Sequence, residues 1–231
     1  SRPRSTRSGS DPVGSWWLVL ALVVAGGALG VVLARQLAVV EYRIDEEEDR
    51  PPLRALWAVP PALAATWGIL GWHLGGRAGG VALPAYLLLA VSGVALWRID
   101  LDVHRLPEGL TLPTALATAL LLLLATALVG DWSAAARAGV GGLATLLGLG
   151  LLSLLTGGAF GFGDVVLGAA LGIALGWLDL RAALWGPAFG FVIAGVVAVV
   201  GLATRRMGMK SDLAMGPYLL LGALVAVLSV P

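Results

Sequence analysis

Cysteine is absent from this chain of 231 residues. Its absence excludes a disulfide framework, a thiol nucleophile and a cysteine-based zinc site. The two histidines, His73 and His104, are too few for a histidine-rich metal centre. We therefore expect neither a metal ion nor any other cofactor.

Charge is also scarce. Only 13% of the residues are charged, against about 25% in an ordinary soluble domain. The net charge of +1 gives no electrostatic basis for binding a nucleic acid. Hydrophobic residues make up 58% of the chain, which indicates a membrane protein with the lipid bilayer as its surroundings.

Long apolar runs support that interpretation. Several approach or reach the length of about 17–25 residues that a helix needs to cross a bilayer. They show little alternation of period two, which favours helices over a membrane barrel. The predicted fold is therefore all-α, a polytopic membrane protein with about eight transmembrane helices. The candidate spans are residues 15–40, 56–74, 81–97, 110–129, 138–156, 165–178, 182–203 and 213–230.

Basic residues are distributed unevenly between the connections that join these spans. The odd-numbered connections hold nine: Arg35, Arg43, Arg50, Arg54, Arg98, Arg105, Arg205, Arg206 and Lys210. The even-numbered ones hold three: Arg77, Arg137 and Arg181. Because basic loops stay in the cytoplasm, we expect the odd connections there. The first of them contains an acidic run at residues 41–49, which we interpret as a solvated loop.

Two acids stand at the ends of spans. Asp164 follows Gly161-Phe162-Gly163 directly before the sixth span, and Asp100 lies just after the third. Taken singly, Asp164 fits a helix N-cap and Asp100 an interfacial acid near Arg98. Both border odd connections, so both are expected on one membrane face. Two carboxylates sharing one proton can perform aspartyl catalysis, in which one activates water and the other protonates the carbonyl oxygen.

Three motifs in order resemble those of the type IV prepilin peptidases. Gly161-Phe162-Gly163-Asp164 matches the GxGD motif. The stretch from Asp100 through Leu106-Pro107 to Leu110-Thr111-Leu112-Pro113 is similar to the family's Asp-x6-Pro segment, and Met215-Gly216-Pro217-Tyr218 is similar to its FGPF. The resemblance implies a multi-pass aspartyl endopeptidase of the bacterial cytoplasmic membrane. Its partners would be the leader peptides of prepilins or pseudopilins.

The resemblance also implies roles and a division of the chain. Asp100 and Asp164 match the catalytic pair, whereas Asp102 matches a variable position. Gly161 and Gly163 would serve substrate docking, and Pro107 would shape the loop. Gly216 and Pro217 would give structural support. A polar tail (residues 1–14) would precede N-terminal helices (15–97) that carry an acidic cytoplasmic loop (41–54). The peptidase core would occupy residues 98–231.

Three departures from the family pattern leave alternatives open. Val166 stands where family members commonly carry lysine, and Glu108 follows the proline in place of Asp or Asn. The first connection lacks the paired cysteines of larger members, which speaks against N-methyltransferase activity. The alternatives are a catalytically inactive relative and an ion- or proton-coupled transporter or channel. The acids Asp131, Asp179 and Asp212 are interpreted as structural, the first and last as helix caps.

Overall fold

The structure is a computed structural model that describes residues 12–47, 55–76, 78–157, 161–205 and 213–230. Eight α-helices account for most of these residues, and none of them forms a strand. The predicted all-α fold is confirmed. The helices are α1 (Pro12–Leu37), α2 (Val59–Leu74), α3 (Leu83–Val103), α4 (Glu108–Val129), α5 (Trp132–Leu155), α6 (Phe162–Leu178), α7 (Leu180–Ala203) and α8 (Gly216–Ser229).

Five segments are long and apolar enough to cross a membrane: Trp16–Leu37, Gly80–Val103, Glu108–Val129, Trp132–Leu155 and Leu180–Ala203. Two further apolar helices, α6 and α8, are shorter. Many large apolar side chains on the outside of α1, α4, α5 and α7 are exposed, as expected for surfaces that face lipid. The chain is a polytopic membrane protein.

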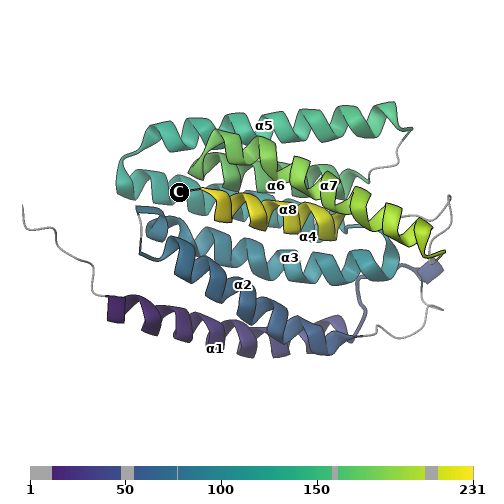
Figure 1. Ribbon diagram of the computed structural model, residues 1–231, viewed down its shortest axis with the longest axis horizontal. Coiled ribbons are helices and arrows are strands. Elements are labelled where there is room, and N and C mark those ends of the chain that lie inside the picture. Colours follow the sequence, from purple (N-terminus) through teal and green to yellow (C-terminus); the bar gives the residue numbers. More distant parts are fainter. Residues whose placement is uncertain (1–11, 48–54, 77, 158–160, 206–212, 231) are drawn as a thin grey trace, which may run out of the picture.

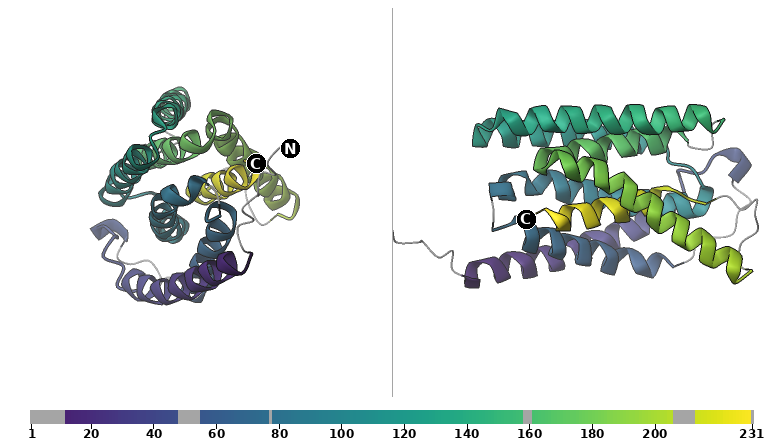
Figure 2. Two further views of the ribbon diagram at one scale, coloured as in Figure 1. Left: turned by 90° about the vertical axis from the view of Figure 1, so that its left-hand side faces the viewer. Right: turned by 45° about the horizontal axis from the view of Figure 1, so that its top comes forward.

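The helices run back and forth along the long axis of the molecule, so successive connections alternate between its two ends (Figure 1). The view along this axis in Figure 2 shows α1 at the edge of the bundle. Helix α6 lies inside, because it packs against α4, α5, α7 and α8. Gly141 of α5 and Gly172 of α6 let these two backbones approach closely, since a Cβ on either would collide with the other's carbonyl oxygen.

Two predicted boundaries were wrong. Helix α5 begins at Trp132 rather than at residue 138, because Asp131 caps it by accepting hydrogen bonds from the backbone N–H groups of Ser133 and Ala134. Helix α3 continues past Trp97 to Val103. Asp100 therefore lies in the last turns of a helix and not in a connection.

Of the remaining structural acids, Asp179 caps α7 through the backbone N–H of Arg181. The interpretation of Asp131 and Asp179 as structural is confirmed. Asp212 lies outside the described residues.

Candidate active site

Asp100 is buried near the end of α3 and reaches across to the start of α8. Its Oδ2 accepts a 2.8 Å hydrogen bond from the backbone N–H of Gly216. Gly216 is the first residue of α8, so this N–H is one of the donors that a helix N-terminus leaves without an intrahelical partner. Asp100 thus caps α8 from 116 residues away in the sequence.

Helix α3 ends at Val103, three residues after Asp100. His104 takes a left-handed conformation with φ of 54°, and its N–H donates to the carbonyl of Asp100. The left-handed residue turns the chain out of the helix. Pro107, in extended conformation, then precedes α4 as its N-cap. The short connection between α3 and α4 consequently lies against the site.

Asp164 is buried as the third residue of α6. The N-cap of this helix is Gly161, so the interpretation of Asp164 as the N-cap itself was wrong. Its carboxylate lies against the backbone of Gly161, where an acid at the third helical position reaches back to the cap. Its Oδ1 is buried and has no hydrogen-bond partner among the described residues. A hydrogen bond to a substrate or a water molecule would satisfy this oxygen.

Leu106 brings the two acids together. A Cβ added to Gly163 would collide with the carbonyl oxygen of Leu106, and one added to Gly216 would lie 3.4 Å from its Cδ1. The same added atom on Gly216 would lie 2.9 Å from Oδ2 of Asp100. The end of α3 and the starts of α6 and α8 therefore meet around one leucine. Asp100 and Asp164 are close enough there for their charges to repel each other.

These contacts place Asp100 and Asp164 at the same end of the helix bundle, as the prediction of one shared membrane face requires. The first connection lies at the same end, because Arg105 bonds Glu47. The fourth and sixth connections meet at the other end, where Arg137 donates to the carbonyl of Trp177.

Asp102 is not part of this meeting point. Its carboxylate binds Arg43 through two hydrogen bonds of 2.9 Å and accepts a third from the Tyr42 hydroxyl at 2.8 Å. The hydrogen bond to Asp102 raises the pKa of Arg43. Burial, followed by the hydrogen bond to Asp102, raises the pKa of Tyr42. The raised pKa values keep Arg43 charged and Tyr42 protonated, the states in which both side chains donate to Asp102.

The acids Glu41, Asp45 and Glu46 are exposed, as expected for a solvated loop, and the structure corrects that interpretation only at Glu47. Glu47 is only 6% exposed and pairs with Arg105. The described part of the loop, up to Glu47, is thus docked on the connection between α3 and α4. Opposite charges on connections expected at one membrane face were the signal in the sequence that could have predicted this docking.

A scan against family models matches residues 86–204 to the type IV leader peptidase family. The match covers just over half of the chain. The chain belongs to the type IV leader peptidase family. The matched segment includes both Asp100 and Asp164 and ends before Gly216.

Curated members of the family are similar over a longer stretch. A protein named "Prepilin leader peptidase/N-methyltransferase" from Aeromonas hydrophila is 35% identical over 177 residues, which are 74% of this chain and 53% of that protein. The protein of the same name from Burkholderia pseudomallei (strain 1026b) is 35% identical over 151 residues, 62% of this chain and 45% of the relative. The chain thus spans about half the length of the curated relatives it matches. No solved structure matches it.

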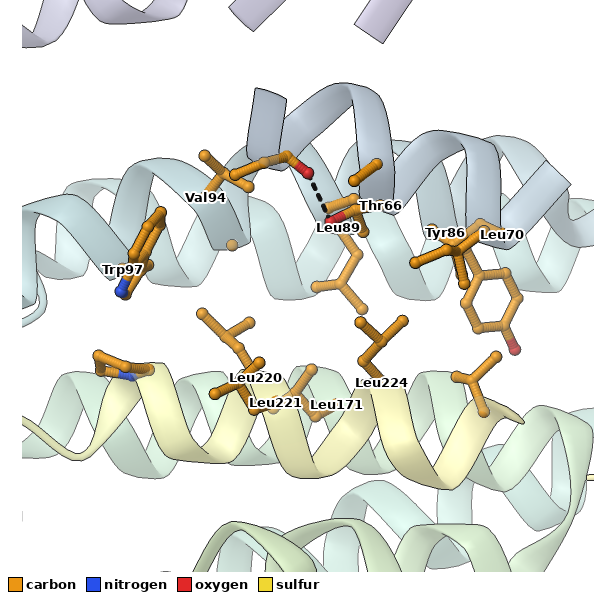
Figure 3. Close-up of a pocket in the computed structure, with 17 residues that line it drawn as sticks. Thr66, Leu70, Tyr86, Leu89, Val94, Trp97, Leu171, Leu220, Leu221 and Leu224 are labelled. Atoms are coloured by element: carbon orange, nitrogen blue, oxygen red, sulfur yellow. Dashed lines mark hydrogen bonds between the residues drawn. The ribbon is translucent and has the colours of Figure 1, made fainter. Parts of the chain in front are cut away.

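In this family member an apolar cavity of about 390 Å³ lies beside the site, between α2, α3 and α8. Trp97 and Tyr86 stand towards opposite ends of it, and leucines of α8 line one wall (Figure 3). Pro217, which also lines it, directly follows the Gly216 that binds Asp100.

The two glycines of the GxGD motif differ in exposure. Gly161, exposed at the start of α6, borders Asp164, whereas Gly163 is buried against Leu106. Val166, in place of the usual lysine, is buried in α6. Among the described residues, no three His, Cys, Asp or Glu side chains are grouped so as to hold a metal ion.

The sequence analysis gave Gly216 a supporting role. It missed the hydrogen bond from the N–H of Gly216 to Asp100 and the position of Leu106 between the helix ends.

Proposed function

We propose that this chain is a membrane aspartyl endopeptidase that removes the leader peptide of type IV prepilins or prepilin-like proteins. The cleavage takes place at the cytoplasmic face of the bacterial inner membrane. The observation that carries the proposal is the convergence of Asp100 and Asp164 at Leu106, with one Asp164 oxygen left without a partner. Membership of the leader peptidase family supports the same assignment.

The two carboxyls divide the chemistry between them. Two like charges this close do not both ionise readily, so the pair shares one proton. The ionised carboxylate takes a proton from a water molecule, and the water oxygen attacks the carbonyl carbon of the scissile peptide bond. The protonated carboxyl donates its proton to the carbonyl oxygen. When the tetrahedral intermediate collapses, the C–N bond breaks and the departing nitrogen takes the proton that the first carboxylate had accepted from water. One hydroxyl of the intermediate returns its proton to the second carboxylate, which restores the starting state of the pair.

The contacts of each acid favour one division of roles. The N–H that Gly216 donates to Asp100 stabilises the ionised form of that carboxyl, so Asp100 is assigned as the base. Asp164, whose Oδ1 receives no donor from the described residues, is assigned as the proton donor.

The proposal is tested by reconstituting the purified chain in lipid vesicles with a prepilin. We expect one cut at the junction between the leader and the apolar segment, identified by mass spectrometry of both products. The competing assignment, an ion or proton pathway, predicts ion flux through the same vesicles and an intact prepilin. Intact prepilin together with flux that depends on Asp100 and Asp164 would replace the peptidase assignment.

A further inference from the structure

The connection between α1 and α2 is fastened to the end of α3 by a buried ion pair. Arg43 binds both oxygens of Asp102, through Nε to Oδ2 and through Nη2 to Oδ1. The two side chains are only 5% and 9% exposed. Bidentate pairing of this kind fixes the relative orientation of both groups. Tyr42 adds a hydrogen bond to the same carboxylate.

A second ion pair fastens the same connection to the chain between α3 and α4. Arg105 donates from Nε to Oε1 of Glu47 at 2.9 Å and from Nη2 to Oε2 at 2.8 Å. Its Nη2 also donates to the carbonyl oxygen of Tyr42. Glu47 in turn accepts from the backbone N–H of Ile44, which closes the single 3-10 turn Asp45–Glu47. Residues 42–47 therefore form a compact unit that these two ion pairs attach to the other described residues.

Each attachment point lies within two residues of a contact that sets the site. Asp102 is two residues after Asp100 in α3. Arg105 directly precedes Leu106, against which the starts of α6 and α8 pack. A shift of Asp102, the first attachment point, moves Asp100 relative to the N–H of Gly216. A shift of Arg105, the second attachment point, moves Leu106 and so changes the spacing of Asp100 and Asp164.

We propose that residues 42–47 are a clamp that positions the Asp100–Asp164 pair, with Arg43 and Glu47 as its positioning residues. The inference rests on the proposed peptidase function, because it concerns the same two acids. Neither Arg43 nor Glu47 touches them. Both act through their partners, Asp102 and Arg105, on the geometry in which water and the peptide bond are held.

The test compares steady-state cleavage by Arg43→Gln and Glu47→Gln with that by the parent. Because misplacement of a reacting group by about 1 Å can cost up to about 100-fold in rate, we expect kcat to fall about 10-fold or more. Neither Arg43 nor Glu47 is assigned to substrate binding, so KM stays within about twofold of the parent. Arg137→Gln is the matched control, since it removes the ion pair with Asp131 at the opposite end of the bundle. Its kcat remains that of the parent.

Exchange of the two charges of the Glu47–Arg105 ion pair is expected to restore the lost activity. Glu47→Arg combined with Arg105→Glu restores opposite charges at the two positions, and kcat recovers towards the parent value relative to either single change. Tyr42→Phe, which removes one hydroxyl and no charge, is the milder variant if a charge variant does not fold. It lowers kcat by about two- to fivefold, the cost of one lost hydrogen bond. Folded variants with an unchanged kcat, or with a raised KM alone, overturn the clamp.

Hydrogen exchange separates failure of the clamp from failure of the peptidase assignment. In Glu47→Gln we expect faster amide exchange in residues 98–106 and 161–166 and no change in residues 131–141. If the parent cuts no prepilin, the peptidase assignment fails while the exchange comparison still decides whether the segment holds these helix ends. Unchanged exchange in residues 98–106 and 161–166 overturns the clamp.

Discussion

The backbone N–H of Gly216 at the start of α8 donates a 2.8 Å hydrogen bond to Oδ2 of Asp100 near the end of α3. The bond ties a candidate catalytic carboxylate to the last helix of the bundle. It also explains why position 216 is glycine, because a Cβ there would lie 2.9 Å from the same oxygen. The spacing of the acid pair therefore depends on a residue outside the segment that matches the family model.

Gly216→Ala is expected to lower leader cleavage by about 10- to 100-fold, since the methyl group displaces the Asp100 carboxylate from its productive position. The variant should still insert and remain helical, because alanine is a good helix former. The measurement is kcat of the purified variant in detergent, with circular dichroism to verify folding.

Gly195→Ala in α7 is the control for that substitution. A Cβ at this position meets nothing within 4 Å, so the change should leave cleavage at the parent level. Equal activity of the two alanine variants and the parent would show that the bond from Gly216 does not set the site.

The two glycines of the GxGD motif are expected to respond differently to alanine. Gly163→Ala forces a Cβ onto the carbonyl of Leu106 and should destabilise the protein by about 1–3 kcal/mol. Gly161→Ala places its Cβ 3.5 Å from Oδ2 of Asp164, an ordinary contact, and should leave stability near that of the parent. Thermal unfolding in detergent measures both.

Cleavage by the Gly161→Ala variant then tests substrate docking at this exposed position. A loss of cleavage without a loss of stability supports docking there. If Gly163→Ala is as stable as the parent, packing against Leu106 does not explain the second glycine of the motif.

Long-range contacts account for what the sequence could not predict. The eight helices follow from apolar runs, and the shared face of Asp100 and Asp164 follows from counting connections. The end of α3 was misplaced because Arg98, Asp100 and Asp102 interrupt the apolar run, although the helix buries Arg98 and Asp100. The docking of Glu47 depends on Arg105, 58 residues away. The charges within either connection do not predict this pair, and only a comparison of the two connections could have suggested it.

Asp131 provides a pH-dependent test of the cap on α5. The hydrogen bond from the Ser133 hydroxyl, together with the backbone donors, lowers the pKa of Asp131 below its usual value of about 3.9. A lowered pKa stabilises the folded state fully above the unfolded-state value, and this contribution is lost as pH falls through the folded-state pKa. The thermal midpoint of the parent should therefore exceed that of Asp131→Asn at pH 6, and the difference should shrink below about pH 4. A difference that is constant from pH 6 to pH 3 would contradict this role.

The central claim is that Asp100 and Asp164 act as one catalytic pair, and leader cleavage by their asparagine variants tests it most directly. Asparagine keeps the size of the side chain but can be neither the ionised base nor an effective proton donor. Asp100→Asn and Asp164→Asn should each lower cleavage by about 100- to 10,000-fold, and the double variant should be no worse than either single one, because the pair works as a unit. Asp131→Asn, at the other end of the bundle, should cleave like the parent. Full cleavage by a folded Asp100→Asn or Asp164→Asn variant would contradict the account.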